Sequence, residues 1–213
     1  MGSELLHFGG ALLCGVLACV ALLREHQSFV HRVFAAGMLL LSAEAVFTGL
    51  SVASLSPADV LRWQHLRFGA AALLPGCWLL FGLRFSGAES RPMMGAWKWG
   101  LAAAFLVPLS FVTVFTGGFF AGLPVYVSSH GWLLNLGWSG YGFVVCFVVG
   151  VVITMMVLER ALHASKGRKR WQVKFLVLGI IALFSARIYS GSQALLFHGL
   201  RLEMEVVNAV ALI

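Results

Sequence analysis

Charge is scarce in this sequence. Of its 213 residues only 11% are charged, aspartate and glutamate together number 8, and 60% are hydrophobic. A soluble domain of this length carries far more charge than this. The shortage of charge therefore excludes a soluble globular protein and indicates a chain that lies in a membrane.

Long polar stretches are equally rare, and the longest runs over residues 159–174. No soluble domain fits between the apolar segments. The net charge of +7 comes from short loops, which do not offer the folded basic surface of a nucleic-acid-binding domain. We expect membrane lipids, whose anionic headgroups attract such loops, to be partners, and no nucleic acid.

Sequence patterns typical of catalysis and metal binding are missing. The chain has no nucleophile elbow, no phosphate-cradling glycine loop and no H-x-x-x-H pair. Its four cysteines lie in apolar segments without metal-ligand spacing, and its seven histidines are scattered among the segment ends. We expect no metal, no cofactor and no catalytic residue in this segment.

Apolar segments, in contrast, fill most of the chain. A bilayer core requires about 20 apolar residues per helix. Seven segments qualify or begin to qualify, at residues 5–23, 33–55, 62–83, 97–117, 133–158, 173–197 and 206–213. The last is too short for a full span, and we expect it to be a truncated seventh helix. The predicted fold is an all-α polytopic membrane helix bundle, a single domain over residues 1–213.

Positive charge alternates along these segments. Two, three and six of the 15 Lys and Arg residues lie in the connections around residues 24–32, 84–98 and 160–174, and few lie in the opposite connections. Because basic loops stay in the cytoplasm, the N-terminus is predicted to lie outside. The fifth helix is expected to extend past the membrane into the third basic connection.

Two ionisable residues stand near the middle of apolar segments: Glu44 in the second and Arg187 in the sixth. Each costs about 2.5–3.5 kcal/mol to insert without a partner. At about 1.5 Å per residue they lie at similar depth, which would allow them to meet as an ion pair in the bundle interior, although the sequence does not decide whether they touch. The pair is either a structural clamp or a switch in which a ligand or proton competes for one partner.

A second polar group is predicted toward the outer face. Its members come from the third, fifth, sixth and seventh segments: Arg67, Asn135, Ser139, Tyr189, Ser190, Gln193 and Asn208. Together they would form a ligand pocket open to the outside. Interhelical hydrogen bonds without a ligand would also explain them, and Arg67 would also be accommodated by reaching outward to the headgroups.

The connection at residues 118–132 has no formal charge and contains Phe119, Phe120, Tyr126 and Trp132. Two interpretations stay open. The segment folds back over the outer mouth of the bundle as a lid or short hairpin, or it is an interfacial loop with its aromatic rings at headgroup level.

Two prolines, Pro75 and Pro108, lie inside the third and fourth segments. Each predicts a kink, which either bends the helix alone or opens room for a ligand or a hinge.

Three stretches carry a family resemblance. They are WLLFGLR at 78–84, LERALH with KGRKRWQVKFLVLG between 158 and 179, and RIYSGSQALLF at 187–197. They resemble the N-terminal seven-helix region of bacterial sensor histidine kinases. The third stretch looks most like the kinases associated with exosortase and PEP-CTERM sorting systems. The resemblance covers nearly the whole chain and is strongest over residues 158–208.

The resemblance implies a signal-input module in the bacterial inner membrane. An unidentified small-molecule or envelope ligand would act on it, and helices six and seven would pass the signal inward. In the parent protein, domains after residue 213 would make an ATP-dependent protein histidine kinase that forms a homodimer and phosphorylates a response regulator. The segment itself would not be an enzyme, and the resemblance assigns no ligand residues.

Two functions from other classes remain as alternatives, a small membrane transporter and a stand-alone seven-helix receptor. Transporters commonly contain inverted repeats, and none is visible here. A retinal receptor would require a Schiff-base lysine deep in a helix, whereas all four lysines lie in or beside the inner loops.

Overall fold

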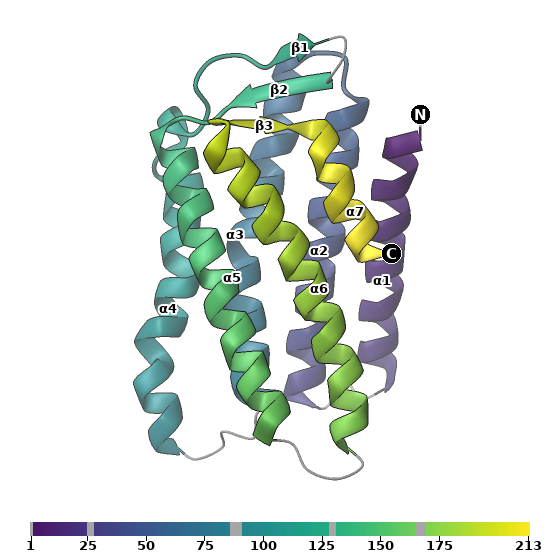
Figure 1. Cartoon of the computed structure of the whole chain (residues 1–213), viewed down its shortest axis with the longest axis vertical. Coiled ribbons are helices and arrows are strands. Elements are labelled where there is room, and N and C mark those ends of the chain that lie inside the picture. Colours follow the sequence, from purple (N-terminus) through teal and green to yellow (C-terminus); the bar gives the residue numbers. More distant parts are fainter. Residues whose placement is uncertain (1, 25–27, 86–90, 128–130, 165–168) are drawn as a thin grey trace.

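The computed structural model describes residues 2–24, 28–85, 91–127, 131–164 and 169–213 (Figure 1). Within these ranges the chain forms seven α-helices, α1 Gly2–Arg24, α2 Phe29–Ala53, α3 Pro57–Phe85, α4 Arg91–Thr113, α5 Trp138–Ala164, α6 Lys169–Leu196 and α7 Val206–Leu212. The helices stand side by side as an up-and-down bundle, which confirms the predicted all-α class.

The described helices suit a membrane. Five of them, α1, α2, α3, α5 and α6, are long and apolar enough to cross a bilayer, and α4 contributes a shorter apolar stretch, Trp97–Thr113. Large apolar side chains face outward, including Leu12 at 71% exposure and Leu106 at 63%. An exterior of this kind is stable only against hydrocarbon, so the chain is a multi-pass membrane protein.

Several helix boundaries differ from the predicted ones, for example at the start of α4, which is Arg91 rather than residue 97. The third helix begins at Pro57 rather than residue 62, since proline is well suited to the first turn of a helix. The fourth ends at Thr113 rather than 117, and the fifth begins at Trp138 rather than 133. The fifth helix does continue to Ala164, as expected, although residues 165–168 lie outside the described ranges.

A small antiparallel sheet lies across one end of the bundle (Figure 1), the end that the charge pattern predicts to face outside and that we call the outer end. Its strands β1 Val125–Val127, β2 Gly131–Asn135 and β3 Gly199–Arg201 occur in the order β1-β2-β3. The first two form the hairpin that was one of the two interpretations of residues 118–132. β3 was not predicted, and it ties the end of α6 to this hairpin by pairing Leu200 with Leu134.

The aromatic residues of this region divide between the core and the surface. Phe119 is fully buried and packs on Phe68 of α3 at a ring-centroid distance of 5.0 Å. Trp132 is 9% exposed, and its Nε1 donates a hydrogen bond of 3.1 Å to the Ser54 carbonyl at the end of α2. Tyr126 is 63% exposed. The interfacial interpretation is therefore wrong for Phe119 and Trp132, which seal the outer end of the core.

Gly137, between β2 and α5, lies against the backbone of Gly118 and Phe119. Its backbone N–H donates to the Phe119 carbonyl at 2.9 Å, and a Cβ at this position would collide with the carbonyl oxygen of Gly118. Because both partners are backbone, Gly137→Ala should lower the free energy of unfolding by about 1–3 kcal/mol. Gly117→Ala is the matched control, since a Cβ at Gly117 meets nothing within 4 Å. Thermal unfolding in detergent measures both, and equal midpoints for the two variants would contradict this packing.

Candidate functional site

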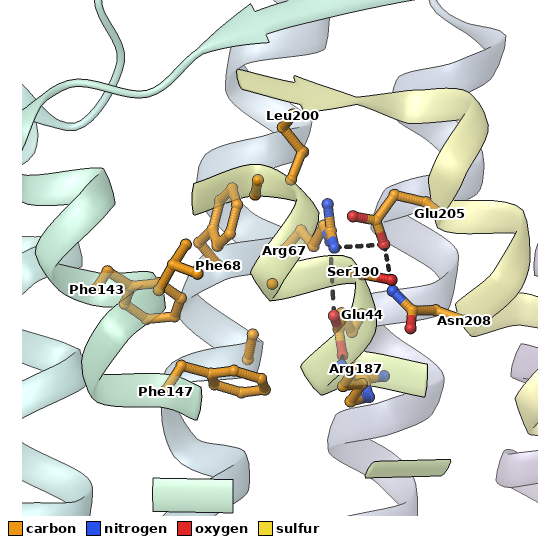
Figure 2. A pocket seen from close by; sticks show the side chains of 14 residues that line it. Glu44, Arg67, Phe68, Phe143, Phe147, Arg187, Ser190, Leu200, Glu205 and Asn208 are labelled. Atoms are coloured by element: carbon orange, nitrogen blue, oxygen red, sulfur yellow. Dashed lines mark hydrogen bonds and ion pairs between the residues drawn. The ribbon is translucent and has the colours of Figure 1, made fainter. Parts of the chain in front are cut away.

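A group of buried polar side chains lies in the interior of the bundle (Figure 2). We call it the polar cluster: Glu44 of α2, Arg67 of α3, Arg187 of α6, Glu205 at the end of the 3₁₀ turn Leu202–Glu205, and Asn208 of α7. Each of the five is at most 9% exposed. Two carboxylates face two guanidinium groups, so the cluster is electrically balanced, as burial requires.

Arg67 is the centre of the polar cluster. Its Nη2 lies 2.7 Å from Oε2 of Glu205, and its Nε lies 3.5 Å from Oε1 of Glu44 (Figure 2). One planar guanidinium therefore contacts carboxylates from two elements, a geometry that suits arginine better than lysine. Arg67 is thus the direct link between α2 and the segment that leads into α7.

Glu44 also pairs with Arg187, whose Nη1 donates a hydrogen bond to Oε2 of Glu44. The two residues, which the sequence placed at a similar depth without deciding whether they touch, form an ion pair. Glu44 therefore lies between two arginines, one on α3 and one on α6. Removing it would leave two buried cations with fewer partners.

Glu205 reaches the core because the chain reverses after α6. His198 has a positive φ of 52°, which ends the helix, and β3 then leads into the turn that carries Glu205 inward. Asn208 Nδ2 donates to Oε2 of Glu205 at 2.7 Å, so the same carboxylate holds both Arg67 and the first turn of α7.

The ionisation of Glu205 follows from these contacts. Burial by itself raises the pKa of the carboxyl, but the charge of Arg67 and the hydrogen bonds from Arg67 and Asn208 hold the pKa below its ordinary value. Glu205 is therefore ionised at neutral pH, as the ion pair with Arg67 requires.

A chain of hydrogen bonds continues from the polar cluster along α3 and α2. Arg67 Nη1 donates to Oε1 of Gln64 at 3.0 Å, Gln64 Nε2 donates to Oγ of Ser51 at 2.7 Å, and Ser51 donates to the Thr48 carbonyl at 2.9 Å. Gln64 and Ser51 are fully buried. These bonds fix the position of Arg67 on α3.

A cavity of about 40 Å³ adjoins the polar cluster. Phe68, Phe143 and Phe147 form its apolar wall, from α3 and α5, and Glu44, Arg67 and Arg187 belong to its polar lining (Figure 2). Among the described residues, Nε of Arg187 and Oδ1 of Asn208 are buried without a hydrogen-bond partner, and Nε of Arg67 has only its ion-pair contact of 3.5 Å with Glu44. Because Arg187 and Asn208 both line the cavity, a donor and an acceptor without partners lie on residues of its wall.

Of the residues predicted for a functional site, Glu44, Arg67, Arg187 and Asn208 come together. Arg67 is 5% exposed, so the interpretation in which it reaches outward to the headgroups is wrong. Ser190 lines the cavity. Gln193 lines a smaller neighbouring recess that shares Glu205.

The remaining predicted residues lie apart. Tyr189 is 50% exposed and is not among the residues that line the cavity. Asn135 is exposed on β2, and Ser139 donates instead to the Phe115 carbonyl at 2.8 Å. These three do not join the polar cluster.

Sequence reasoning missed Glu205, Gln64 and Ser51, together with His7 of α1. His7 is 2% exposed and interacts electrostatically with Glu205 and Arg67. A sequence signal existed for Glu205, because it precedes Asn208 by one helical turn at the start of the last apolar segment. Among the described residues there is no group of His, Cys, Asp or Glu that could hold a metal ion.

One comparison with known proteins identifies the region. The family model described as the N-terminal 7TM region of histidine kinase matches residues 6–204, which include all of the polar cluster except Glu205 and Asn208. A search of curated proteins found no match, and a search of solved structures found none.

Proposed function

The chain belongs to the family of N-terminal seven-transmembrane regions of histidine kinases, and from this premise we propose that the polar cluster is the switch of a signal-input module. In one state Glu205 binds Arg67 of α3 and holds the start of α7 in place against α1 and α6. In the other state that contact is broken and α7 moves. A signal acts by binding the two states with different affinity.

The observation that carries this proposal is the double contact of Arg67 with Glu44 and Glu205. Glu205 lies one residue before α7, and α7 packs on α1 and α6. A group that replaces the Glu205 carboxylate on Arg67 would therefore free the start of α7 without exposing the arginine charge. Interior packing tends to favour such discrete alternatives over gradual deformation.

The cavity supports a switch over a static clamp. A clamp has no need for polar atoms without partners, whereas Arg187 Nε and Asn208 Oδ1 have no hydrogen-bond partner and both residues line a cavity that three phenylalanines also line. We propose that a small molecule or envelope component, entering from the outer side, engages these groups, with Gln193 and Asn208 beside it. Tyr189, which is 50% exposed on α6, is not part of this proposed site.

The proposal also covers the longer protein to which this membrane region would belong. Histidine kinases of this family act in two-component systems, with dimerisation and a response regulator. We propose that α7 continues into a cytoplasmic kinase with a phospho-accepting histidine and an ATP-binding domain, and that the membrane is the bacterial inner membrane with the N-terminus outside. The narrower affiliation with exosortase and PEP-CTERM systems rests on the stretch at residues 187–197.

The experiment that tests the function uses the protein made from its native reading frame. Intact mass and C-terminal sequencing give its length, and membranes containing it are incubated with radiolabelled ATP. We expect a product longer by a kinase region and a phosphoryl group that is labile to acid but stable to alkali, as on histidine. A product that ends near Ile213 and takes up no label would replace the kinase module with a transporter or stand-alone receptor.

A further inference from the structure

A second, larger hollow lies on the other side of α5 from the polar cluster. It is a groove of about 330 Å³ between α4 and α5, with α3 at its base. In Figure 1 α4 stands at the left edge of the bundle beside α5. This volume falls within the range of small-molecule sites, and the groove is not part of the switch proposed above.

Small residues and the two prolines shape the groove. Pro75 and Pro108 both line it, as do Gly100, Ala103 and Gly150. At the base α3 and α5 touch closely, since a Cβ on Gly150 would lie 2.9 Å from Cβ of Pro75. On the α4 wall small side chains leave the space open.

The side chains that line the groove are apolar apart from the Cys146 thiol and the indole nitrogen of Trp97. Apolar cavities of this kind stay free of water. The groove opens between helices whose outward residues face hydrocarbon, for example Leu106 at 63% exposure and Val149 at 52%. An occupant must therefore be a hydrocarbon chain that enters sideways from the bilayer.

The lower end of the groove indicates which lipid enters. Trp97 lines that end, near the start of α4, and Lys98 beside it is exposed. Tryptophan favours the headgroup level, and lysine near a membrane surface attracts anionic lipid. The alternating basic connections place this end on the cytoplasmic side.

We propose that the groove between α4 and α5 binds an acyl chain of an anionic phospholipid from the inner leaflet, with its headgroup near Lys98. The chain lies along Ala103, Val107 and Val149. It packs against α5 on a different face from Phe143 and Phe147, which wall the cavity of the polar cluster. The bound lipid thus supports the helix that separates the two sites.

The test uses the 213-residue chain in nanodiscs of phosphatidylcholine that contain phosphatidylglycerol with a photoactivatable diazirine in its acyl chain. Adducts are located by mass spectrometry. Val107→Trp fills the groove, whereas Leu106→Trp on the same helix faces the bilayer and is the matched control. We expect adducts on the groove residues to fall about tenfold in V107W and to persist in L106W.

Two further arms keep the result decisive. Ala103→Leu, a smaller filler, replaces V107W if that variant does not fold, and it should also reduce labelling. A diazirine on phosphatidylcholine reports headgroup preference and should label the groove less than phosphatidylglycerol. Equal yields in V107W and L106W, or equal labelling by both lipids, would overturn the proposal without affecting the kinase assignment.

Discussion

Glu44→Ala should lower the free energy of unfolding by roughly 3–5 kcal/mol, because it leaves two buried arginines, Arg67 and Arg187, without their shared carboxylate. The measurement is unfolding of the purified chain in mixed micelles. Glu159→Ala is the control, since the Glu159 side chain is 65% exposed and its only described ion pair is with His163 at 3.8 Å. Its removal should change stability by less than about 1 kcal/mol.

The cause of that loss can be checked with a second substitution. Arg187→Met combined with Glu44→Gln removes one cation together with the carboxylate and leaves the Arg67–Glu205 pair intact. The double variant should be more stable than Glu44→Gln alone, because fewer unpaired buried charges remain. A purely additive result would mean that Glu44 and Arg187 do not depend on each other.

A simple charge exchange between these two positions is expected to fail. In the combination Glu44→Arg with Arg187→Glu, the new cation on α2 would face Arg67, whose Nε lies 3.5 Å from the present Glu44 oxygen. Like charges at this distance repel strongly in a buried site. Because Glu44 also contacts Arg67, the charges of Glu44 and Arg187 cannot be exchanged without placing two cations side by side.

Glu205→Gln should shift the equilibrium between the two states of the full-length kinase by about 10- to 100-fold and thereby change its rate of autophosphorylation. The change keeps the shape of the side chain but removes the charge bound by Arg67, and a charge-assisted hydrogen bond contributes about 1.5–3 kcal/mol. Autophosphorylation in native membranes is the measurement. Asp59→Asn, at an exposed carboxylate in the first turn of α3, is the matched control and should leave the output unchanged.

Glu205→Gln also distinguishes a switch from a structural clamp. If Glu205→Gln lowers stability but leaves the phosphorylation rate at its original value, then the Arg67–Glu205 contact only holds the bundle together. A changed rate in a protein that still folds supports a state change at α7.

The depth of the buried polar residues along their helices was the feature of the site that could be predicted best from the sequence. Glu44 and Arg187 lie near the middle of their segments, and a rise of about 1.5 Å per residue converts those positions into similar depth. The burial of both charges then requires a partner, and the two meet. The same reasoning placed Asn208 and Arg67 in the outer half, where both join the polar cluster.

Rotation and chain reversal could not be predicted in the same way. Whether Arg67 faces the interior depends on how α3 is turned about its axis, and its apolar neighbours do not define one polar face. The partner Glu205 depends on three residues of β3 pairing with β2, a contact between segments about 65 residues apart in sequence. Strands this short carry almost no sequence pattern, so the residues that lead into α7 appeared to be an ordinary loop.

The central claim is that breaking the Arg67–Glu205 contact moves α7, and a reversible cross-link tests it most directly. A Cβ on Gly10 of α1 would lie 3.2 Å from Cβ of Leu212 in α7, close to the spacing of about 3.5–4.5 Å in disulfides. Gly10→Cys with Leu212→Cys, in a background without other cysteines, the four of residues 1–213 included, should therefore fix α7 to α1 when oxidised.

The measurement is autophosphorylation of this full-length variant, with and without Glu205→Gln, before and after reduction. Glu205→Gln is expected to change the output only in the reduced protein, because the cross-link prevents α7 from moving. If the change is equally large in the fully cross-linked protein, then α7 does not transmit the signal and the account is contradicted.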